Sequence, residues 1–182
     1  MDQANERRIV IMGAGGRDFH TFLTTMKNDP AVRVVAITAA QIPYINDRRL
    51  PASLAGERYP DGIRITDEEN LLDILASENI DEVVFAYSDV THDYVASKRK
   101  IVEDAGVAFS TFDVDRTMVK STKPVVAVTA VRTGCGKSAV SRCVIKALAA
   151  NGLKSAAIRH PMPYGDLGKQ AVQRFETMQD LT

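Results

Sequence analysis

Short apolar runs alternate with helical patterns along the first 110 residues of this chain. The runs lie at 8–12, 32–37, 82–86 and 107–109. After the first run, Phe19, Phe22, Leu23 and Met26 have the i, i+3, i+4, i+7 spacing of one helix face, which ends at Asn28-Asp29-Pro30. Strands that alternate with helices form parallel sheets. We therefore predict an α/β fold, with a Rossmann-like doubly wound parallel sheet over residues 1–120.

Two further helices are expected inside this domain. Thr66 and Glu69 form a capping box, which predicts that a helix begins there and continues through Leu71, Leu72 and Leu75. The next stripe predicts a helix before the last strand, with apolar or long side chains at Tyr94, Val95, Lys98, Ile101, Val102 and Ala105.

A second domain is indicated over residues 121–182 by an apolar run, a glycine turn and a helical stripe in direct succession. Residues 125–128 have the β-branched content of a buried strand, and the helix carries Val140, Cys143, Val144, Ala147 and Leu148 on one face. The sequence GCGKS between them is typical of a phosphate-binding loop, because glycines let several backbone N–H groups point at one anion. The predicted nucleotide-binding residues are Thr133, Gly134, Cys135, Gly136, Lys137, Ser138 and Ala139.

In this interpretation Lys137 reaches the β- and γ-phosphates of ATP, and the Ser138 hydroxyl ligates Mg²⁺. Val131 departs from the usual pattern, which has glycine at that position. The alternative is a glycine turn that only connects a structural strand to a helix.

The residues after this helix predict one more strand, at 155–158, and then a loop near the γ-phosphate. His160 and Asp166 of that loop are candidate catalytic residues together with Lys137. A proline-stiffened surface loop is the alternative. Because no later apolar strand ends in an aspartate that could order Mg²⁺, we expect this P-loop NTPase domain to be present only in its N-terminal part.

Composition excludes several classes of function. Lys and Arg number 23, as do Asp and Glu, so no basic field favours nucleic acid as a partner. The apolar runs are too short to span a membrane, and the first residues are too polar for a secretory signal. Cys135 and Cys143 have neither metal-ligand company nor a disulfide pattern. These features predict a cytoplasmic protein.

The glycine turn at residues 13–16 predicts an anion site in the first domain. Gly13, Gly15 and Gly16 stand beside Arg17 and His20. A dinucleotide is disfavoured, because Asp18 takes the place of the third glycine and Thr38 stands where an NAD ribose needs a carboxylate. A small phosphorylated or carboxylated ligand fits this pattern better.

Four other polar residues are candidates for substrate binding. Arg48 and Arg49 lie in a long proline-containing connection and offer guanidinium groups to phosphate or carboxylate. Asp89 and His92 follow a strand at the end where α/β folds bind ligands. The alternatives are solvated surface charges for the arginines and a helix cap for Asp89 or His92.

Six segments together resemble the cyclic 2,3-diphosphoglycerate synthetase family: GAGGRDFH, TAAQIP, LAGERYPDGI, YSDVTHDYV, VRTGCGKS and RHPMPYGDL. The resemblance covers nearly the whole chain. It implies that VRTGCGKS is the nucleotide loop, so Val131 belongs to the family pattern. The implied reaction is the closure of 2,3-diphosphoglycerate into a cyclic phosphoanhydride while ATP becomes ADP and phosphate. The expected cofactor is Mg²⁺, and the expected substrate is a small phosphorylated molecule. A homodimer is a possible assembly.

Two other classes of function stay open on the sequence. One is a regulatory GTPase or metallochaperone built on the same P-loop, although no guanine-selecting Asn-Lys-x-Asp segment is present in this sequence. The other is a nucleotide-free Rossmann sensor with a vestigial P-loop.

Overall fold

The structure is a computed structural model that describes residues 6–13, 16–40, 48–87, 90–130, 134–159, 167–169, 171–177 and 179. The chain divides into two compact units, Met1–Thr117 with Pro161–Thr182, and Met118–His160. In chain order the elements are β1 (Arg7–Met12), α1 (Arg17–Thr21), the π-helix η1 (Phe22–Met26), β2 (Val32–Ala39), β3 (Arg49–Leu50), α2 (Ala52–Ala55), β4 (Ile63–Asp67), the 3₁₀ helix η2 (Glu68–Asn70), α3 (Leu71–Ser77), β5 (Glu82–Phe85), α4 (His92–Asp104), β6 (Ala108–Thr111), the 3₁₀ helix η3 (Val114–Thr117) and α5 (Lys137–Ala150).

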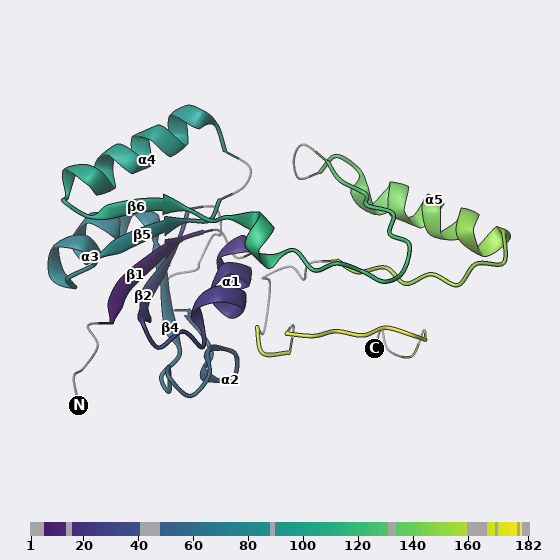
Figure 1. The fold of residues 1–182 in the computed structure, drawn as a ribbon, viewed down its shortest axis with the longest axis horizontal. Helices are drawn as coiled ribbons and strands as arrows, with labels where there is room; N and C mark the ends of the chain where they lie inside the picture. Colours follow the sequence, from purple (N-terminus) through teal and green to yellow (C-terminus); the bar gives the residue numbers. More distant parts are fainter. Residues whose placement is uncertain are drawn as a thin grey trace. The chain divides into compact units, whose positions relative to one another are not determined.

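The first unit is built on a six-stranded sheet with the order β3-β4-β2-β1-β5-β6 (Figure 1). Every pairing is parallel except that of β3 with β4. The parallel strands, counted along the chain, therefore have the order 3-2-1-4-5, which is that of a Rossmann sheet. The α/β, Rossmann-like prediction is confirmed for this unit.

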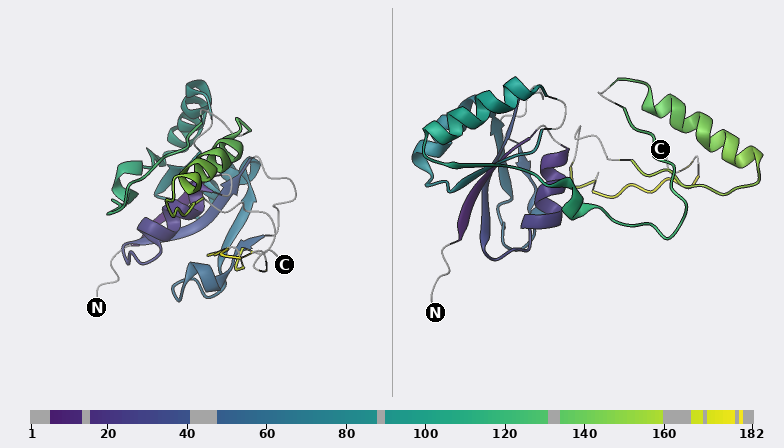
Figure 2. Two further views of the ribbon diagram at one scale, coloured as in Figure 1. Left: turned by 90° about the vertical axis from the view of Figure 1, so that its right-hand side faces the viewer. Right: turned by 45° about the horizontal axis from the view of Figure 1, so that its top comes forward.

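Helices cover both faces of the sheet (Figures 1 and 2). Alternate residues of β1 point to opposite faces, so that Ile11 belongs to one buried cluster and Val10 to the other. Phe22 of η1 and Ala55 of α2 pack in the first cluster, whereas α3 and α4 contribute to the second. The sheet is therefore doubly wound, as predicted.

A β-bulge interrupts the pairing of β2 with β1. Ile9 is opposite Val34, but the next residue of β1, Val10, is opposite Ala36. Val35 is thus an extra residue on β2, which locally changes the side-chain alternation. β2 also begins well before β4, whose Arg64 is opposite Ala36. This offset leaves the first residues of β2 without a strand partner on the β4 side.

The capping box predicted at Thr66 and Glu69 is not formed. Thr66 lies within β4, and helical turns begin only at Glu68. The physical reason is tertiary: β4 pairs with β2 as far as Asp67, so the backbone of Thr66 belongs to the sheet. The Thr66 hydroxyl instead accepts a hydrogen bond from the Asn70 side chain at 2.9 Å. The sequence interpretation therefore missed strand β4.

Two of the predicted helix stripes, at residues 19–26 and 71–75, each contain one leucine that is exposed in the structure. Leu23 is 40% exposed because the helix widens into the π-helix η1, in which the Lys27 N–H bonds to the Phe22 carbonyl at 2.8 Å. Leu72 is 55% exposed, and Ile74 takes its place in the core beside Leu71 and Leu75.

The second unit contains helix α5, and its two predicted strands are not formed. Residues 125–128 and 155–158 carry no strand, and Val125 and Val126 are 71% and 63% exposed. A strand needs a hydrogen-bonded neighbour, and neither segment has one in the described ranges. The predicted apolar stripe of α5 is likewise uncovered, since no residue of this helix is buried. A P-loop NTPase sheet is therefore not formed by these residues.

Within the ranges that the structure describes, no helix has the length and apolar character needed to cross a membrane.

Candidate functional site

The glycine turn after β1 lies at the carboxyl edge of the sheet, where open α/β sheets bind ligands. The Gly13 N–H bonds to the Thr38 carbonyl at 2.9 Å, which extends the pairing of β1 with β2. A Cβ atom added to Gly13 would lie 2.1 Å from the Cβ of Asp18, so the turn accepts only glycine at this position.

Asp18 already supplies a carboxylate to this turn. Its side chain is 1% exposed, and its Oδ1 accepts a hydrogen bond from the Gly16 N–H at 2.5 Å. That N–H is one of the donors expected to bind the ligand, but in the structure it donates its hydrogen bond to the Asp18 carboxylate. The residue that disfavoured a dinucleotide in the sequence therefore also occupies part of the predicted anion site.

Thr38 offers an unused polar atom at the same edge. Its hydroxyl is fully buried, and no described residue forms a hydrogen bond with it. Buried polar atoms are nearly always satisfied in native proteins, so an unpartnered hydroxyl indicates a water or ligand atom beside it. The hydroxyl belongs to the residue whose carbonyl accepts the hydrogen bond of the Gly13 N–H.

His20 remains near this edge, whereas Arg17 faces solvent. His20 Nε2 is 3.2 Å from the Thr117 hydroxyl of η3, and its ring meets Phe112 edge-on with the ring centroids 6.4 Å apart. Phe112 follows β6, so the imidazole lies beside the ends of β1 and β6. Arg17, at the start of α1, is exposed.

A buried polar cluster that the sequence interpretation missed completes the carboxyl edge. Glu68 follows β4 and is 8% exposed. Its two carboxylate oxygens accept hydrogen bonds from the hydroxyls of Tyr87 and Tyr94, both at 2.7 Å. Lys98 forms an ion pair with the same carboxylate and lies over the Tyr94 ring. We call these four residues the Glu68 cluster. No sequence signal predicted it, because strand β4, which Glu68 follows, was itself not predicted.

The tyrosines of the Glu68 cluster are held in the protonated state. Burial, followed by the hydrogen bond from the hydroxyl to Glu68 and the negative charge of Glu68, raises the pKa of Tyr87 and of Tyr94 above the ordinary value of 10.0. Both hydroxyls therefore act as hydrogen-bond donors at neutral pH and not as general bases. The cluster fixes the positions of three elements, η2, the end of β5 and α4, behind the candidate site.

The structure does not bring the other predicted substrate residues together. Arg49 lies opposite Arg64 near the amino end of β4, away from the glycine turn. Arg48 uses its carbonyl to accept a hydrogen bond from Ile65 at 2.9 Å. His92 is the first residue of α4 and is exposed, and the cap of that helix is Thr91, whose hydroxyl accepts from the Tyr94 N–H at 3.3 Å.

Five predicted site residues lie outside the described residues: Gly15, Asp89, Thr133, His160 and Asp166.

Two glycines of the glycine-lysine turn in the second unit have left-handed backbone conformations. Gly134 and Gly136 have φ angles of 84° and 83°, in the left-handed region that favours glycine. Helix α5 begins directly after Gly136, at Lys137, so its first N–H groups face the turn. Lys137, Ser138 and Ala139 are exposed, as is Cys135. Among the described residues no group of three or more His, Cys, Asp or Glu side chains gathers to hold a metal.

Comparison with known proteins gives one strong similarity. The chain is 52% identical over 181 residues to the arginine synthetase ArcE of Thermococcus kodakarensis. The match covers 100% of this chain, which spans 40% of the length of that relative. No protein-family profile matches the chain.

Among solved structures, the chain is similar to RSP, a Rex-family repressor, with 19% identity and a TM-score of 0.42 over 82% of this chain and 64% of that one. The complex of RSP with NAD⁺ and operator DNA gives 16% identity and a TM-score of 0.43, over 83% of this chain and 62% of the other. A likeness at this level carries no information about ligand or function.

Proposed function

We propose that this protein takes part in an ATP-dependent synthetase reaction, in which the γ-phosphoryl group of ATP activates an oxygen atom of a second substrate. The observation that carries the proposal is the 52% identity, along the whole chain, to a protein named as a synthetase. The glycine-lysine turn before α5 supports it independently, because its backbone suits a triphosphate.

The residues of the second unit have separate roles in this proposal. The N–H groups of Gly134–Ser138 hold the β-phosphate, and the Lys137 ammonium group neutralises charge on the transferred group. Ser138 would supply one oxygen ligand for Mg²⁺, since Mg²⁺ typically binds one or two protein groups besides phosphate and water. Bound Mg²⁺ stabilises the negative charge that develops on the phosphate oxygens.

The carboxyl edge of the first unit is the proposed site for the second substrate. Arg17 and His20 offer positive or donor groups to an anionic substrate, and the Thr38 hydroxyl offers a further hydrogen bond. The Glu68 cluster keeps the strand ends behind these groups in place.

Two substrates are candidates, and each has its own support. The sequence segments favour 2,3-diphosphoglycerate, one of whose phosphates accepts the γ-phosphoryl group. An oxygen of its other phosphate then attacks the phosphorus atom of that first substrate phosphate and forms the P–O–P bond of the cyclic anhydride. The bond to the transferred phosphoryl group breaks, and this group leaves as inorganic phosphate. The name of the relative favours arginine formation. There a ureido oxygen, as in citrulline, accepts the phosphoryl group, ammonia attacks the carbon, and phosphate leaves with that oxygen.

One experiment tests the proposal and separates the candidates. Titration calorimetry first measures binding of Mg²⁺·ATP to the chain, to Lys137→Ala and to the matched control Lys146→Ala, which lies on the same helix. We expect Lys137→Ala to weaken binding about tenfold or more and Lys146→Ala to leave it unchanged, since a hydrogen bond to a charged group contributes about 1.5 to 3 kcal/mol.

Two reaction mixtures containing the protein and Mg²⁺·ATP are then compared. Phosphorus NMR follows the mixture with 2,3-diphosphoglycerate, and amino-acid analysis follows the mixture with citrulline and ammonium. A cyclic phosphoanhydride signal assigns the first reaction, and arginine formation assigns the second. Hydrolysis of ATP or GTP with both substrates unchanged would overturn the synthetase proposal and favour the regulatory GTPase class.

A further inference from the structure

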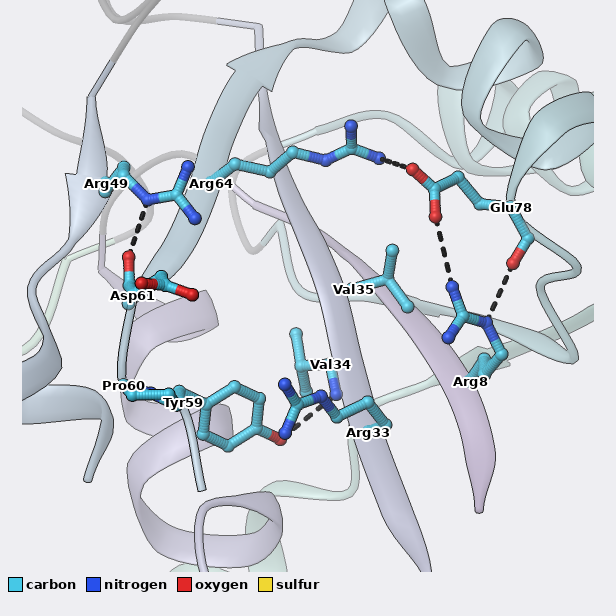
Figure 3. A pocket seen from close by; sticks show the side chains of 11 residues that line it. Arg8, Arg33, Val34, Val35, Arg49, Tyr59, Pro60, Asp61, Arg64 and Glu78 are labelled. Atoms are coloured by element: carbon cyan, nitrogen blue, oxygen red, sulfur yellow. Dashed lines mark hydrogen bonds and ion pairs between the residues drawn. The ribbon is translucent and has the colours of Figure 1, made fainter. Parts of the chain in front are cut away.

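A polar cavity lies at the amino edge of the sheet, opposite to the candidate site. It has a volume of about 310 Å³ and includes the side chains of Arg8, Arg33, Arg49, Arg64, Asp61 and Glu78 in its lining (Figure 3). We call it the amino-edge pocket. It exists because β2 starts before β4, and the Tyr59 hydroxyl, not a strand, accepts the hydrogen bond of the Val34 N–H at 3.1 Å.

The lining of the amino-edge pocket carries an excess of positive charge. Four guanidinium groups face two carboxylates, which gives a formal net charge of +2. Glu78 is shared: Oε2 accepts from Arg8 at 3.1 Å, and Oε1 accepts from Arg64 at 3.0 Å. One carboxylate therefore compensates two arginines, and the remaining positive charge faces the cavity.

Arg49 and Arg64 are directly opposite each other in the antiparallel pairing of β3 with β4. Like charges in such a cross-strand pair destabilise a sheet unless a negative charge lies between them. In the described part of the chain, the Arg49 side chain donates one hydrogen bond, to the carbonyl of Asp61 at 2.7 Å, and forms no ion pair with a described carboxylate.

One further observation indicates a missing hydrogen-bond acceptor, and a second shows that the pocket is arranged in advance. The Nε atom of Arg64 is buried, and within the described ranges it has no hydrogen-bond partner. Arg33 is held in place from behind, because its guanidinium stacks on the Tyr59 ring at 4.5 Å and donates to the Arg58 carbonyl. The arginines are thus arranged before any ligand arrives, which reduces the entropy cost of binding.

We propose that the amino-edge pocket binds a small anion that carries at least two phosphate or carboxylate groups. The anion lies beside Arg49 and Arg64, accepts a hydrogen bond from the buried Arg64 N–H, and forms charge-assisted hydrogen bonds with both side chains. Because the pocket lies at the opposite edge of the sheet from the candidate site, its ligand is an effector and not the substrate. This inference is independent of the proposed function.

The test uses the full chain and two probes, inorganic pyrophosphate and succinate, in titration calorimetry at constant ionic strength. We expect saturable one-site binding of at least one probe, which tells phosphate from carboxylate recognition. Arg49→Gln should weaken binding about tenfold or more, since it removes a charged donor. Arg99→Gln, an exposed arginine of α4 paired with Glu103, is the matched control and should bind as the wild type does.

Lys137→Ala separates this pocket from the glycine-lysine turn, which also attracts phosphates. Binding that survives Lys137→Ala and is lost in Arg49→Gln supports the proposal. Binding lost in Lys137→Ala but kept in Arg49→Gln, or no binding of either probe, would overturn it. The circular dichroism spectrum and melting temperature of Arg49→Gln show whether a loss reflects unfolding, and Arg33→Gln then tests the same pocket from another strand.

Discussion

Among single residues, Glu68 has the most demanding environment, because its buried carboxylate is satisfied by Tyr87, Tyr94 and Lys98 at once. Replacing Tyr87 by phenylalanine removes one donor and keeps the ring. We expect this variant to lower the free energy of unfolding by about 1 to 2 kcal/mol at pH 8, as measured by urea denaturation.

The same variant should show a pH dependence with a definite sign. The pKa of Tyr87 is raised in the folded state, so the stabilisation from its protonated hydroxyl is complete below pH 10 and is lost as the pH rises further. The difference in stability between wild type and Tyr87→Phe should therefore be smaller at pH 11 than at pH 8. An equal difference in stability at both pH values would contradict the raised pKa of Tyr87 in the folded state. The Glu69→Gln variant, changed at an exposed residue, is the control for general effects of pH.

At the scale of elements, helix α3 tests how far a sequence stripe predicts burial. Leu72 belongs to the predicted stripe but is 55% exposed, whereas Ile74 is 5% exposed. We expect Ile74→Ala to lower the free energy of unfolding by about 2 to 4 kcal/mol, because it leaves a cavity between α3 and the sheet. Leu72→Ala, the matched control, should cost less than about 1 kcal/mol. Equal losses of unfolding free energy in the two variants would show that the buried face of α3 is assigned wrongly.

At the scale of the whole molecule, the two units differ in how much apolar surface they bury. β1 has four buried residues in its last four positions, whereas α5 has none among its 14 residues. A 14-residue helix without tertiary packing is marginal in water. Hydrogen exchange followed by NMR should therefore be at least about a hundredfold slower for the central amides of β1 than for those of α5. Similar protection in both would mean that α5 is packed in solution.

The sequence predicted the elements whose signal is local and strong. The buried runs that became β1, β2 and β5 were recognisable, because strands covered on both faces are apolar at nearly every position. The run at 107–109 predicted β6, which forms at Ala108–Thr111 as an edge strand without a buried residue. β4 was missed because Arg64, Thr66 and Asp67 interrupt its apolar residues, and because Thr66 with Glu69 imitates a helix start. Its burial at Ile63 and Ile65 depends on β2, which lies far away in the sequence.

The candidate site was predictable only in part for a similar reason. Gly13 was predicted as a site residue, and Asp18 and Thr38 were noted only as departures from a dinucleotide motif. The sequence did not indicate that the Asp18 carboxylate accepts the Gly16 N–H. The Glu68 cluster joins three segments, and no spacing along the chain links Glu68 with Tyr87. Arg49 was predicted to bind an anion at the substrate site, but β3 pairs antiparallel with β4 and places Arg49 at the amino edge.

The sequence by itself determined the alternation of strand and helix, the glycine turns and the helix that starts at Lys137, because dihedral preferences and hydrophobic periodicity act over a few neighbouring residues. Only the tertiary structure decided which polar groups meet. Strand order and register bring distant residues to one edge, and they place Gly13, Thr38 and Glu68 at the carboxyl edge and four arginines at the other. Charges and hydrogen-bonding atoms act through space, so their partners follow from the packing of the sheet and not from their order in the chain.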